Sequence, residues 1–234
     1  MQTPMTKLPA TIAACGLALL AGCATTQKTE LKRSELNCGL LGARLCSQLQ
    51  PGSEEQAGLR WINPAARWTQ YSKVMIEPVS YWGDDKDQIS PDDQQAIVNY
   101  FNQTLREELG KKFTLVDQPA AGVMRIQVAL TNAETATPVM RSVSMVVPQA
   151  HMLSNIGYVA TGSFPFVGGA QVEAKVSDAA TGAVLAAIAD RRLGGGSFGT
   201  GLQWKLGDIE NAMKLWSETA AARLSAWTSG SAKP

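Results

Sequence analysis

The chain has 234 residues, of which 21 are basic and 20 are acidic, so its formal net charge at pH 7 is +1. Lys and Arg do not cluster, and this balance argues against a nucleic-acid partner, which needs many phosphate-neutralising contacts. It also leaves no polybasic patch for anionic lipid headgroups. Once a leader is set aside, the remaining length suits one domain with a single hydrophobic core.

The first 22 residues predict an export signal. Lys7 and the free amine provide the positive start, and the apolar run Leu8–Gly22 is too short for a comfortable membrane span. The run ends in Leu20-Ala21-Gly22-Cys23, which resembles the lipobox of bacterial lipoproteins. That resemblance implies cleavage before Cys23, attachment of lipid to its thiol, and acylation of the new amino terminus by a chain such as palmitate. The three acyl chains implied exceed the two membrane-binding signals that stable anchoring requires.

Ala24, and not Asp, follows the lipidation site. By resemblance to the sorting of Gram-negative lipoproteins, this favours the outer membrane, with the protein facing the periplasm. An ordinary signal peptide with a chance cysteine is the alternative. We therefore expect a signal peptide over 1–22, a lipidated tether and lead-in over 23–50, a single periplasmic domain over 51–228, and a flexible tail over 229–234.

Two of the four cysteines remain after Cys15 leaves with the signal and Cys23 takes up lipid. An oxidising periplasm favours a disulfide between Cys38 and Cys46. A regular helix over eight residues would hold the two Cα atoms about 12 Å apart, whereas a disulfide needs less than about 7 Å. The segment is therefore expected to be bridged or regularly helical, and not both. Metal binding is the alternative, but two cysteines without a nearby histidine or second CxxC make a poor site.

The domain opens with a short β-rich run over 73–79. Ser90-Pro91 followed by two acids is a strong helix start, because Ser caps the helix, Pro suits its first position and acids favour its positive end. The helix is expected to stop at Gly110. Its buried face is marked by apolar residues at four-residue spacing: Ile97, Phe101, Leu105 and Leu109.

Strands are predicted over 114–116, 123–131 and 171–178, then a turn over 179–182, a strand over 184–192 and a helix over 208–227. This order, β-α-β-β-(apolar connection)-β-β-α, predicts an α/β (α+β) domain. We expect a single mixed or antiparallel sheet of about five strands, covered by two helices on one face. The last helix carries one apolar stripe: Ile209, Met213, Trp216, Ala220, Leu224 and Trp227.

Several different short motifs are spread over most of the chain: Ser90-Pro91, Tyr100-Phe101, Leu115-Val116-Asp117, Ala129-Leu130-Thr131, Val147-Pro148, Phe166-Val167-Gly168, Thr181-Gly182 and Asp190-Arg191-Arg192. In combination they resemble, from about Cys38 to Trp216, a family of bacterial lipoproteins known as domain of unknown function 3313. The resemblance implies no activity, substrate or catalytic residue. The element order is also similar to the periplasmic domain of curli-secretion and penicillin-binding-protein-activating lipoproteins, in topology alone.

The apolar connection lies between the strands ending near 131 and starting near 171. Val147 to Val172 has no charged residue, and Arg141 is the one charged residue between Glu134 and Glu173. Core packing and a partner interface are the two main interpretations, the second with Phe164 and Phe166 as contacts. Membrane insertion is disfavoured, because the glycines and prolines leave no pair of alternating strands.

No catalytic constellation, metal site or cofactor motif emerges. His151 is the single histidine, so any imidazole chemistry would have to use it, yet no charged orienting partner is near it in sequence. A structural or surface role for His151 is favoured. The acidic stretch from Asp84 to Asp93 lacks the spacing of a calcium loop and is interpreted as a solvated loop that leads into a helix cap.

Asp190, Arg191 and Arg192 end an apolar strand in front of the glycine loop Gly194–Gly196. They are either an anion site, in which guanidinium and loop amides bind a carboxylate or phosphate, or an ion pair that fixes the strand end; we favour the ion pair. The sequence thus indicates a non-enzymatic envelope lipoprotein that binds envelope partners or itself. The alternatives are a periplasmic anion-binding or hydrolytic domain that uses these residues, and an oligomeric secretion or pore component.

Overall fold

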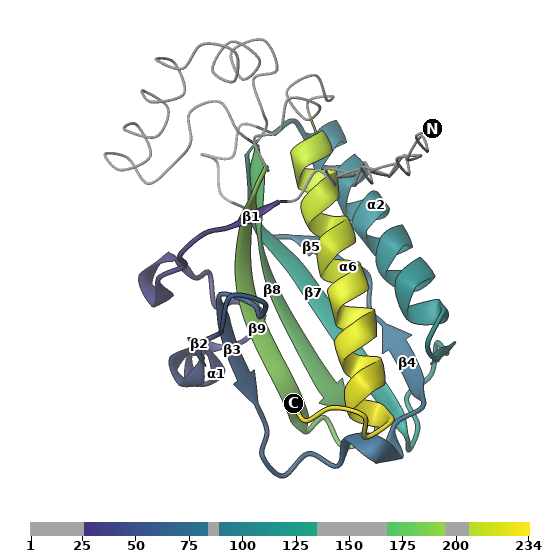
Figure 1. Ribbon diagram of the computed structural model, residues 1–234. Coiled ribbons are helices and arrows are strands. Elements are labelled where there is room, and N and C mark those ends of the chain that lie inside the picture. Colours follow the sequence, from purple (N-terminus) through teal and green to yellow (C-terminus); the bar gives the residue numbers. More distant parts are fainter. Residues whose placement is uncertain (1–25, 84–88, 135–167, 195–205) are drawn as a thin grey trace, which may run out of the picture.

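The computed structural model describes residues 26–83, 89–134, 168–194 and 206–234 (Figure 1). The lipobox with Cys23 lies outside these residues. The same is true of His151, Phe164 and Phe166, and of the apolar connection except for its last residues, 168–172. The roles expected of these residues therefore stay predictions.

One mixed sheet forms the centre of the described part of the chain. Its strand order is β2-β3-β9-β8-β7-β4-β6, with β1 added to β9 and β5 to β7, which makes nine strands among the described residues. Strands β4, β5 and β6 join by parallel pairing and the remaining strands by antiparallel pairing. The strands are β1 Gln27–Lys28, β2 Gln50–Pro51, β3 Leu59–Ile62, β4 Lys73–Ile76, β5 Ser80–Tyr81, β6 Thr114–Leu115, β7 Val123–Glu134, β8 Gly169–Asp178 and β9 Val184–Leu193.

The predicted element order is confirmed, but the predicted number of strands is too small. The five expected strands are β4, β6, β7, β8 and β9, while β1, β2, β3 and β5 were not expected. Each of these four has only two to four residues and pairs along a longer strand. Such short runs have no detectable alternation of their own, so tertiary pairing decides their structure.

Two long helices, α2 Pro91–Gly110 and α6 Gly207–Thr228, lie side by side on one face of the sheet (Figure 1). Ser90 caps α2 as expected, because its Oγ accepts a hydrogen bond from the Asp93 amide at 3.2 Å. A third helix, α1 Ala43–Gln48, corrects the expectation of two helices. Two 3₁₀ turns, Arg33–Glu35 and Trp68–Gln70, complete the described elements.

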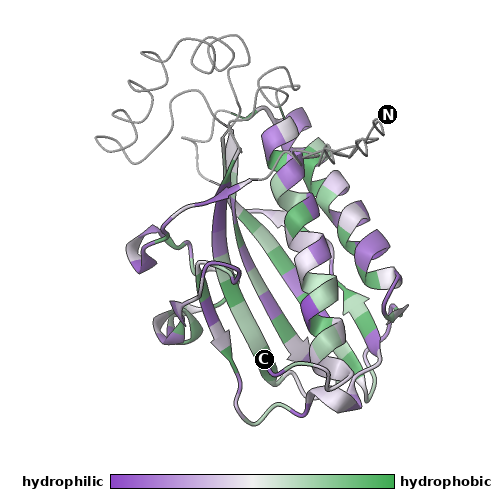
Figure 2. Cartoon of the chain, in the orientation of Figure 1, coloured by the Kyte–Doolittle hydropathy of each residue, from purple (hydrophilic) through white to green (hydrophobic). Residues whose placement is uncertain are grey.

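The main core fills the space between these two helices and the sheet. Figure 2 shows hydrophobic residues on the helix surfaces that face the strands and on the strands beneath them. The predicted alternation of β7 holds: Ile126 and Val128 face the core, while Arg125 and Gln127 on the other face bind the Glu77 carboxylate at 2.8 and 2.7 Å.

The opposite face of the sheet is covered by residues 31–49, which we had expected to belong to a tether and lead-in. Leu31, Leu41, Cys46 and Leu49 pack there against Leu59 and small residues of β9 in a second apolar cluster. The folded part of the chain therefore begins before the boundary expected at residue 51. Burial on this scale is incompatible with a free tether.

The expected disulfide joins Cys38 and Cys46, whose Cα atoms are 5.9 Å apart. Helix α1 begins only at Ala43, after a turn in which Cys38 has φ 60° and Gly42 has φ 76°. The bridged segment is therefore not one regular helix, because a disulfide limits the distance between the two Cα atoms to less than a regular helix of this length would give. The positive φ at Gly42 is one that glycine adopts readily.

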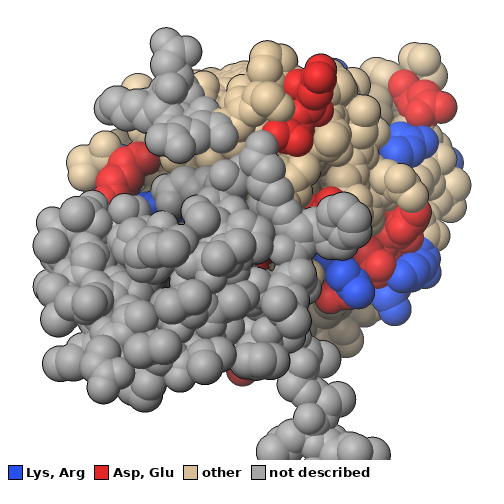
Figure 3. All heavy atoms as spheres, turned by 90° about the horizontal axis from the view of Figure 1, so that it is seen from above, with Lys and Arg blue, Asp and Glu red and all other residues tan. Residues whose placement is uncertain are grey.

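Charged side chains of both signs lie side by side on the described surface seen from above, without a large patch of one sign (Figure 3). Among the described helices, none is both long and apolar enough to cross a membrane.

A candidate ligand cavity between the sheet and helix α6

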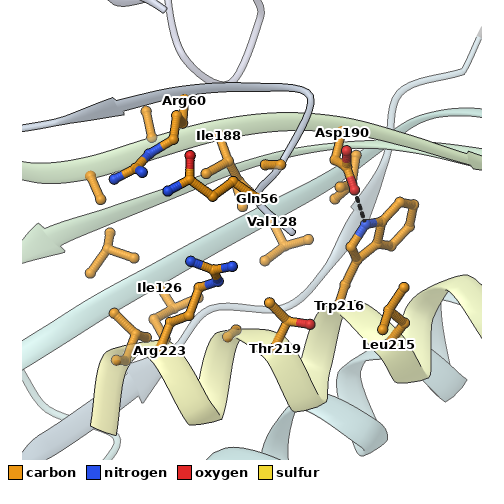
Figure 4. A pocket seen from close by; sticks show the side chains of 18 of the residues that line it. Gln56, Arg60, Ile126, Val128, Ile188, Asp190, Leu215, Trp216, Thr219 and Arg223 are labelled. Atoms are coloured by element: carbon orange, nitrogen blue, oxygen red, sulfur yellow. Dashed lines mark hydrogen bonds between the residues drawn. The ribbon is translucent and has the colours of Figure 1, made fainter. Parts of the chain in front are cut away.

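A cavity of about 290 Å³ lies between α6 and the strands β3, β9, β8 and β7 (Figure 4). Its volume is at the lower end of the roughly 300 to 1,000 Å³ typical of small-molecule sites. Most of its wall is apolar: Ile62, Phe101, Leu105, Ile126, Val128, Val172, Ala174, Val176, Ala186, Ala187, Ile188, Leu215, Trp216, Ala220, Leu224 and Trp227.

Small side chains beneath the middle of α6 account for the cavity. Ala174 and Ala186 face it from the sheet, and Thr219 and Ala220 face it from the helix. These small side chains do not fill the space between the two layers. Aromatic pairs fill the space at either end of this stretch. Phe101 and Trp216 have ring centroids 6.0 Å apart, and Trp68 and Trp227 have theirs 4.9 Å apart.

Two arginines lie on opposite walls of the cavity, which Glu54, Glu55, Asp190 and Arg192 also line. Arg60 is on β3, in register with Ile188 of β9, and Arg223 projects from α6 toward the strands (Figure 4). Burial, and then the positive charge of Arg223, lower the pKa of Arg60. Arginine nevertheless stays protonated in proteins, so two like charges are held close to an apolar wall.

Neither guanidinium has an acidic partner within the described part of the chain. Arg223 donates to the backbone carbonyl of Glu55, and the carboxylates of Glu54 and Glu55 are exposed at the rim without an ion pair to either arginine. Half-buried cations normally pair with an anion. The cavity therefore offers an apolar wall together with two cations that lack a protein counter-charge among the described residues.

Asp190 forms the polar end of the cavity and is 1% exposed. Its Oδ1 accepts from the Gly58 amide at 2.7 Å, and its Oδ2 accepts from Arg192 Nε at 2.7 Å and Trp216 Nε1 at 2.8 Å. The carboxylate thus ties α6, β9 and the residue before β3 together. The ion pair expected at the strand end is present, and it is formed by Nε of Arg192.

Asp190 and Arg192 share the face toward α6, as predicted for alternate strand residues. Arg191 lies in register with Gln171 of β8, and its carbonyl accepts from the Thr29 amide at 3.4 Å. Anion binding by this triplet stays a prediction. A Cβ at position 194 would lie 2.3 Å from Asp208 Oδ1, so a larger residue there would require the Asp208 side chain to move. The rest of the glycine loop lies outside the described residues.

Arg60 and Arg223 were not among the residues predicted from the sequence. They lie far apart in the chain, and nothing in the sequence pairs them. A weak signal exists in hindsight, because Arg223 directly precedes Leu224 of the apolar stripe and Arg60 interrupts the apolar run Leu59–Ile62. A cation next to an apolar face is common, however, since its aliphatic stem covers that face while its charge reaches water.

Fold and cavity define an α+β domain with one mixed sheet, two long helices on one face and a ligand-sized apolar cavity beneath one of them. The chain belongs to the family described as protein of unknown function (DUF3313), whose model matches residues 39–220. No curated protein matches it.

The solved structures that are similar to the chain include the following three. A PelC dodecamer from Paraburkholderia phytofirmans is 11% identical, with 68% of this chain and 95% of that chain covered and a TM-score of 0.38. Protein XCC0632 from Xanthomonas campestris is 11% identical, with 73% and 92% covered and a TM-score of 0.39. Protein CT253 from Chlamydia trachomatis is 12% identical, with 68% and 99% covered and a TM-score of 0.37. Likeness at this level carries no argument about function or assembly.

Proposed function

We propose that this protein is an envelope lipoprotein whose folded domain binds, and does not transform, a small amphipathic anion in the cavity beneath α6. The observation that carries the proposal is the pair Arg60 and Arg223, two cations without acidic partners in the described chain, on the walls of an apolar cavity. A ligand with an apolar chain and a carboxylate or similar head would match both features.

The apolar wall would supply most of the affinity. Each methylene group that leaves water for such a wall contributes about 0.8 kcal/mol. The volume of about 290 Å³ suits a single chain of modest length better than a two-chain phospholipid. A fatty acid such as dodecanoate is therefore the natural probe.

The two guanidiniums would supply specificity for a charged head. A carboxylate placed between Arg60 and Arg223 would relieve their mutual repulsion and could accept bidentate hydrogen bonds. An uncharged alcohol of the same chain length would gain the apolar contacts but would leave both cations uncompensated. The proposal therefore predicts discrimination by charge as well as by chain.

Anchoring at Cys23 in the outer membrane, facing the periplasm, completes the proposal. It is supported by the lipobox-like sequence and by Ala24. Labelling cells with palmitate should mark the wild-type chain and leave Cys23→Ser unmarked. Label on Cys23→Ser, or wild-type protein in the inner membrane fraction, would contradict this part.

The test of the binding site is site-mapped photo-crosslinking. The full chain is exposed to a dodecanoate analogue that carries a diazirine in its tail, and the adducts are located by mass spectrometry. We expect adducts on α6 around Trp216 and Leu224 and on the facing strands, because these residues line the cavity. The double variant Arg60→Ala with Arg223→Ala should label more weakly at the same probe concentration, because the head group loses both cations while the apolar contacts remain.

Arg106→Ala is the matched control, because Arg106 is an exposed arginine on α2 outside the cavity. It should label like the wild type. Labelling spread over the outer surface, or equal labelling in the double variant, would overturn the proposed site.

A further inference from the structure

A second cluster of chemically active side chains lies on the other side of the sheet, away from the cavity. It consists of Cys38 and Cys46 from the lead-in and Glu173 from β8. One ligand atom from each, the two Sγ atoms and a carboxylate oxygen, lie within 4.8 Å of one another. In the oxidised protein the two sulfurs are bonded to each other.

Glu173 is unusual because its side chain is fully buried, at 0% exposed. Its Oε1 accepts from the Cys38 amide at 2.7 Å, and the backbone N–H groups of Asn37 and Leu41 also favour the charged form, while burial, the larger effect, raises the pKa of the carboxyl. Its Oε2 has no hydrogen-bond partner among the described residues. A buried polar atom without a partner is rare and calls for an explanation.

The two oxygens therefore have different roles. One is held by the backbone of the lead-in, which is how outer-sphere hydrogen bonds orient a metal-binding carboxylate. The other is buried and accepts no hydrogen bond in the described chain, so it can act as a ligand. One oxygen of this carboxylate lies within 4.8 Å of both sulfurs. Lys175, which lies on the same face of β8 and donates to the Leu40 carbonyl at 3.1 Å, adds a nearby positive charge that would balance excess thiolate charge.

We propose that reduction of the Cys38–Cys46 disulfide turns this cluster into a binding site for a thiophilic divalent cation, zinc foremost, with Cys38, Cys46 and Glu173 as its three protein ligands. A dithiol supplies the two electrons and becomes a disulfide, the S–S bond breaks, and each sulfur gains a proton. Zinc then displaces both protons, so that two thiolates and one carboxylate bind it.

Zinc fits this set because it binds thiolate sulfur at about 2.3 Å and carboxylate oxygen at about 2.0 to 2.2 Å in tetrahedral geometry. Separations of up to 4.8 Å between ligand atoms need only a small contraction to surround such an ion, and the two sulfurs must move apart from their bonded distance. Three protein ligands leave the fourth position to water. Bound zinc would also hold the lead-in on β8 when the disulfide is open.

The test uses the full mature chain, reduced by a trialkylphosphine under anaerobic conditions and titrated with Co²⁺ and then with Zn²⁺. We expect one metal ion per chain, a sulfur-to-cobalt charge-transfer band that zinc abolishes, and no binding to the oxidised protein. The double variant Cys38→Ser with Cys46→Ser should bind no metal and controls for any thiol elsewhere in the chain.

Glu173→Gln separates the three-ligand site from a plain dithiol pair. It keeps the size and one oxygen of the side chain but loses the carboxylate, so its zinc affinity should fall at least tenfold. Glu35→Gln, at an exposed glutamate of the same lead-in, should bind like the wild type. If Glu173→Gln does not fold, zinc-induced infrared difference spectra of the reduced wild type take its place and should show shifted carboxylate bands.

Three results would overturn the inference: no metal bound by the reduced wild type, unchanged affinity in Glu173→Gln, or no carboxylate shift in the infrared spectrum. Because the cluster lies on the face of the sheet opposite the cavity, none of these results bears on the proposed binding of an amphipathic anion.

Discussion

The two faces of the sheet are covered in different ways. On one face, two long helices pack over apolar strand residues, yet a stretch of small side chains leaves a cavity. On the other face, the lead-in covers polar residues of β8, of which Gln171 and Glu173 are buried and Lys175 is half-buried. Gln171 donates to the Glu35 carbonyl at 3.1 Å, Glu173 accepts from the Cys38 amide, and Lys175 donates to the Leu40 carbonyl.

The comparison shows that polar alternation in a strand does not by itself mean exposure to solvent. The lead-in has little regular structure, so its backbone groups are available as partners for Gln171, Glu173 and Lys175. The helices opposite use their backbone groups internally and can offer the sheet only side chains. A face covered by helices must therefore be filled by side-chain volume, and where this volume falls short a cavity remains.

The largest stability effect is expected at the polar end of the cavity. Asp190→Ala removes the buried acceptor of three hydrogen bonds and leaves Arg192 without its ion-pair partner. Breaking a buried pair in this way costs about 3 to 5 kcal/mol of unfolding free energy. Urea unfolding measures the loss, and Asp92→Ala, at an exposed acid in the first turn of α2, should cost less than about 1 kcal/mol. Similar stability of the two variants would contradict the role given to Asp190.

The second-largest loss of unfolding free energy is expected on the opposite face, when the disulfide is removed. Replacing Cys38 and Cys46 together by Ser removes a cross-link that closes a loop of about nine residues, worth roughly 2.5 kcal/mol through the entropy of the unfolded chain. The unfolding free energy of this variant is compared with that of the wild type under non-reducing conditions. An unchanged unfolding free energy would contradict the stabilisation assigned to the cross-link.

Glu173, on the same face, should make the unfolding free energy depend on pH. Burial raises the pKa of its carboxyl in the folded protein above the unfolded value of 4.5, so its contribution favours folding below that value and is lost as pH rises through the folded pKa. Relative to Glu173→Gln, the wild type should therefore lose stability as pH rises above 4.5 and through the folded-state pKa. Parallel pH profiles of unfolding free energy for the two proteins would contradict the raised pKa.

Arg60 should give the smallest effect, because its charge is repelled by Arg223 and has no acidic partner in the described chain. Arg60→Gln is expected to change the unfolding free energy by less than about 0.5 kcal/mol, or to raise it. Arg192→Ala, which removes the partner of buried Asp190, should lower it clearly. If Arg60→Gln destabilised the protein as much as Arg192→Ala, Arg60 would have a structural role rather than a ligand-binding one.

Local signals predicted the helix-covered face well. Ser90-Pro91 and the four-residue spacing of Ile97, Phe101, Leu105 and Leu109 fixed α2 at both ends, because caps and periodicity are properties of neighbouring residues. The turn between β8 and β9 was predicted for the same reason: Asp178 Oδ1 accepts from the Ala180 and Thr181 amides, and Gly182 adopts φ 75°.

The features that were missed depend on contacts between distant residues. Strand β3 is formed by pairing with β9, and the lead-in is ordered by side chains of β8 more than a hundred residues away. The cavity arginines come from β3 and α6, and only the fold brings them together. By contrast, the Asp190–Arg192 pair was within reach of sequence reasoning, because alternate residues of one strand share a face.

The proposal that the cavity binds an amphipathic anion is tested most directly by charge discrimination. The concentrations of dodecanoate and of dodecanol that displace half of the bound photo-probe are compared in the wild type and in Arg60→Gln with Arg223→Gln. We expect the wild type to prefer dodecanoate by about tenfold or more, equivalent to about 1.4 kcal/mol, and the double variant to lose this preference. Equal preference in both proteins would contradict the role of Arg60 and Arg223, and with it the proposed function.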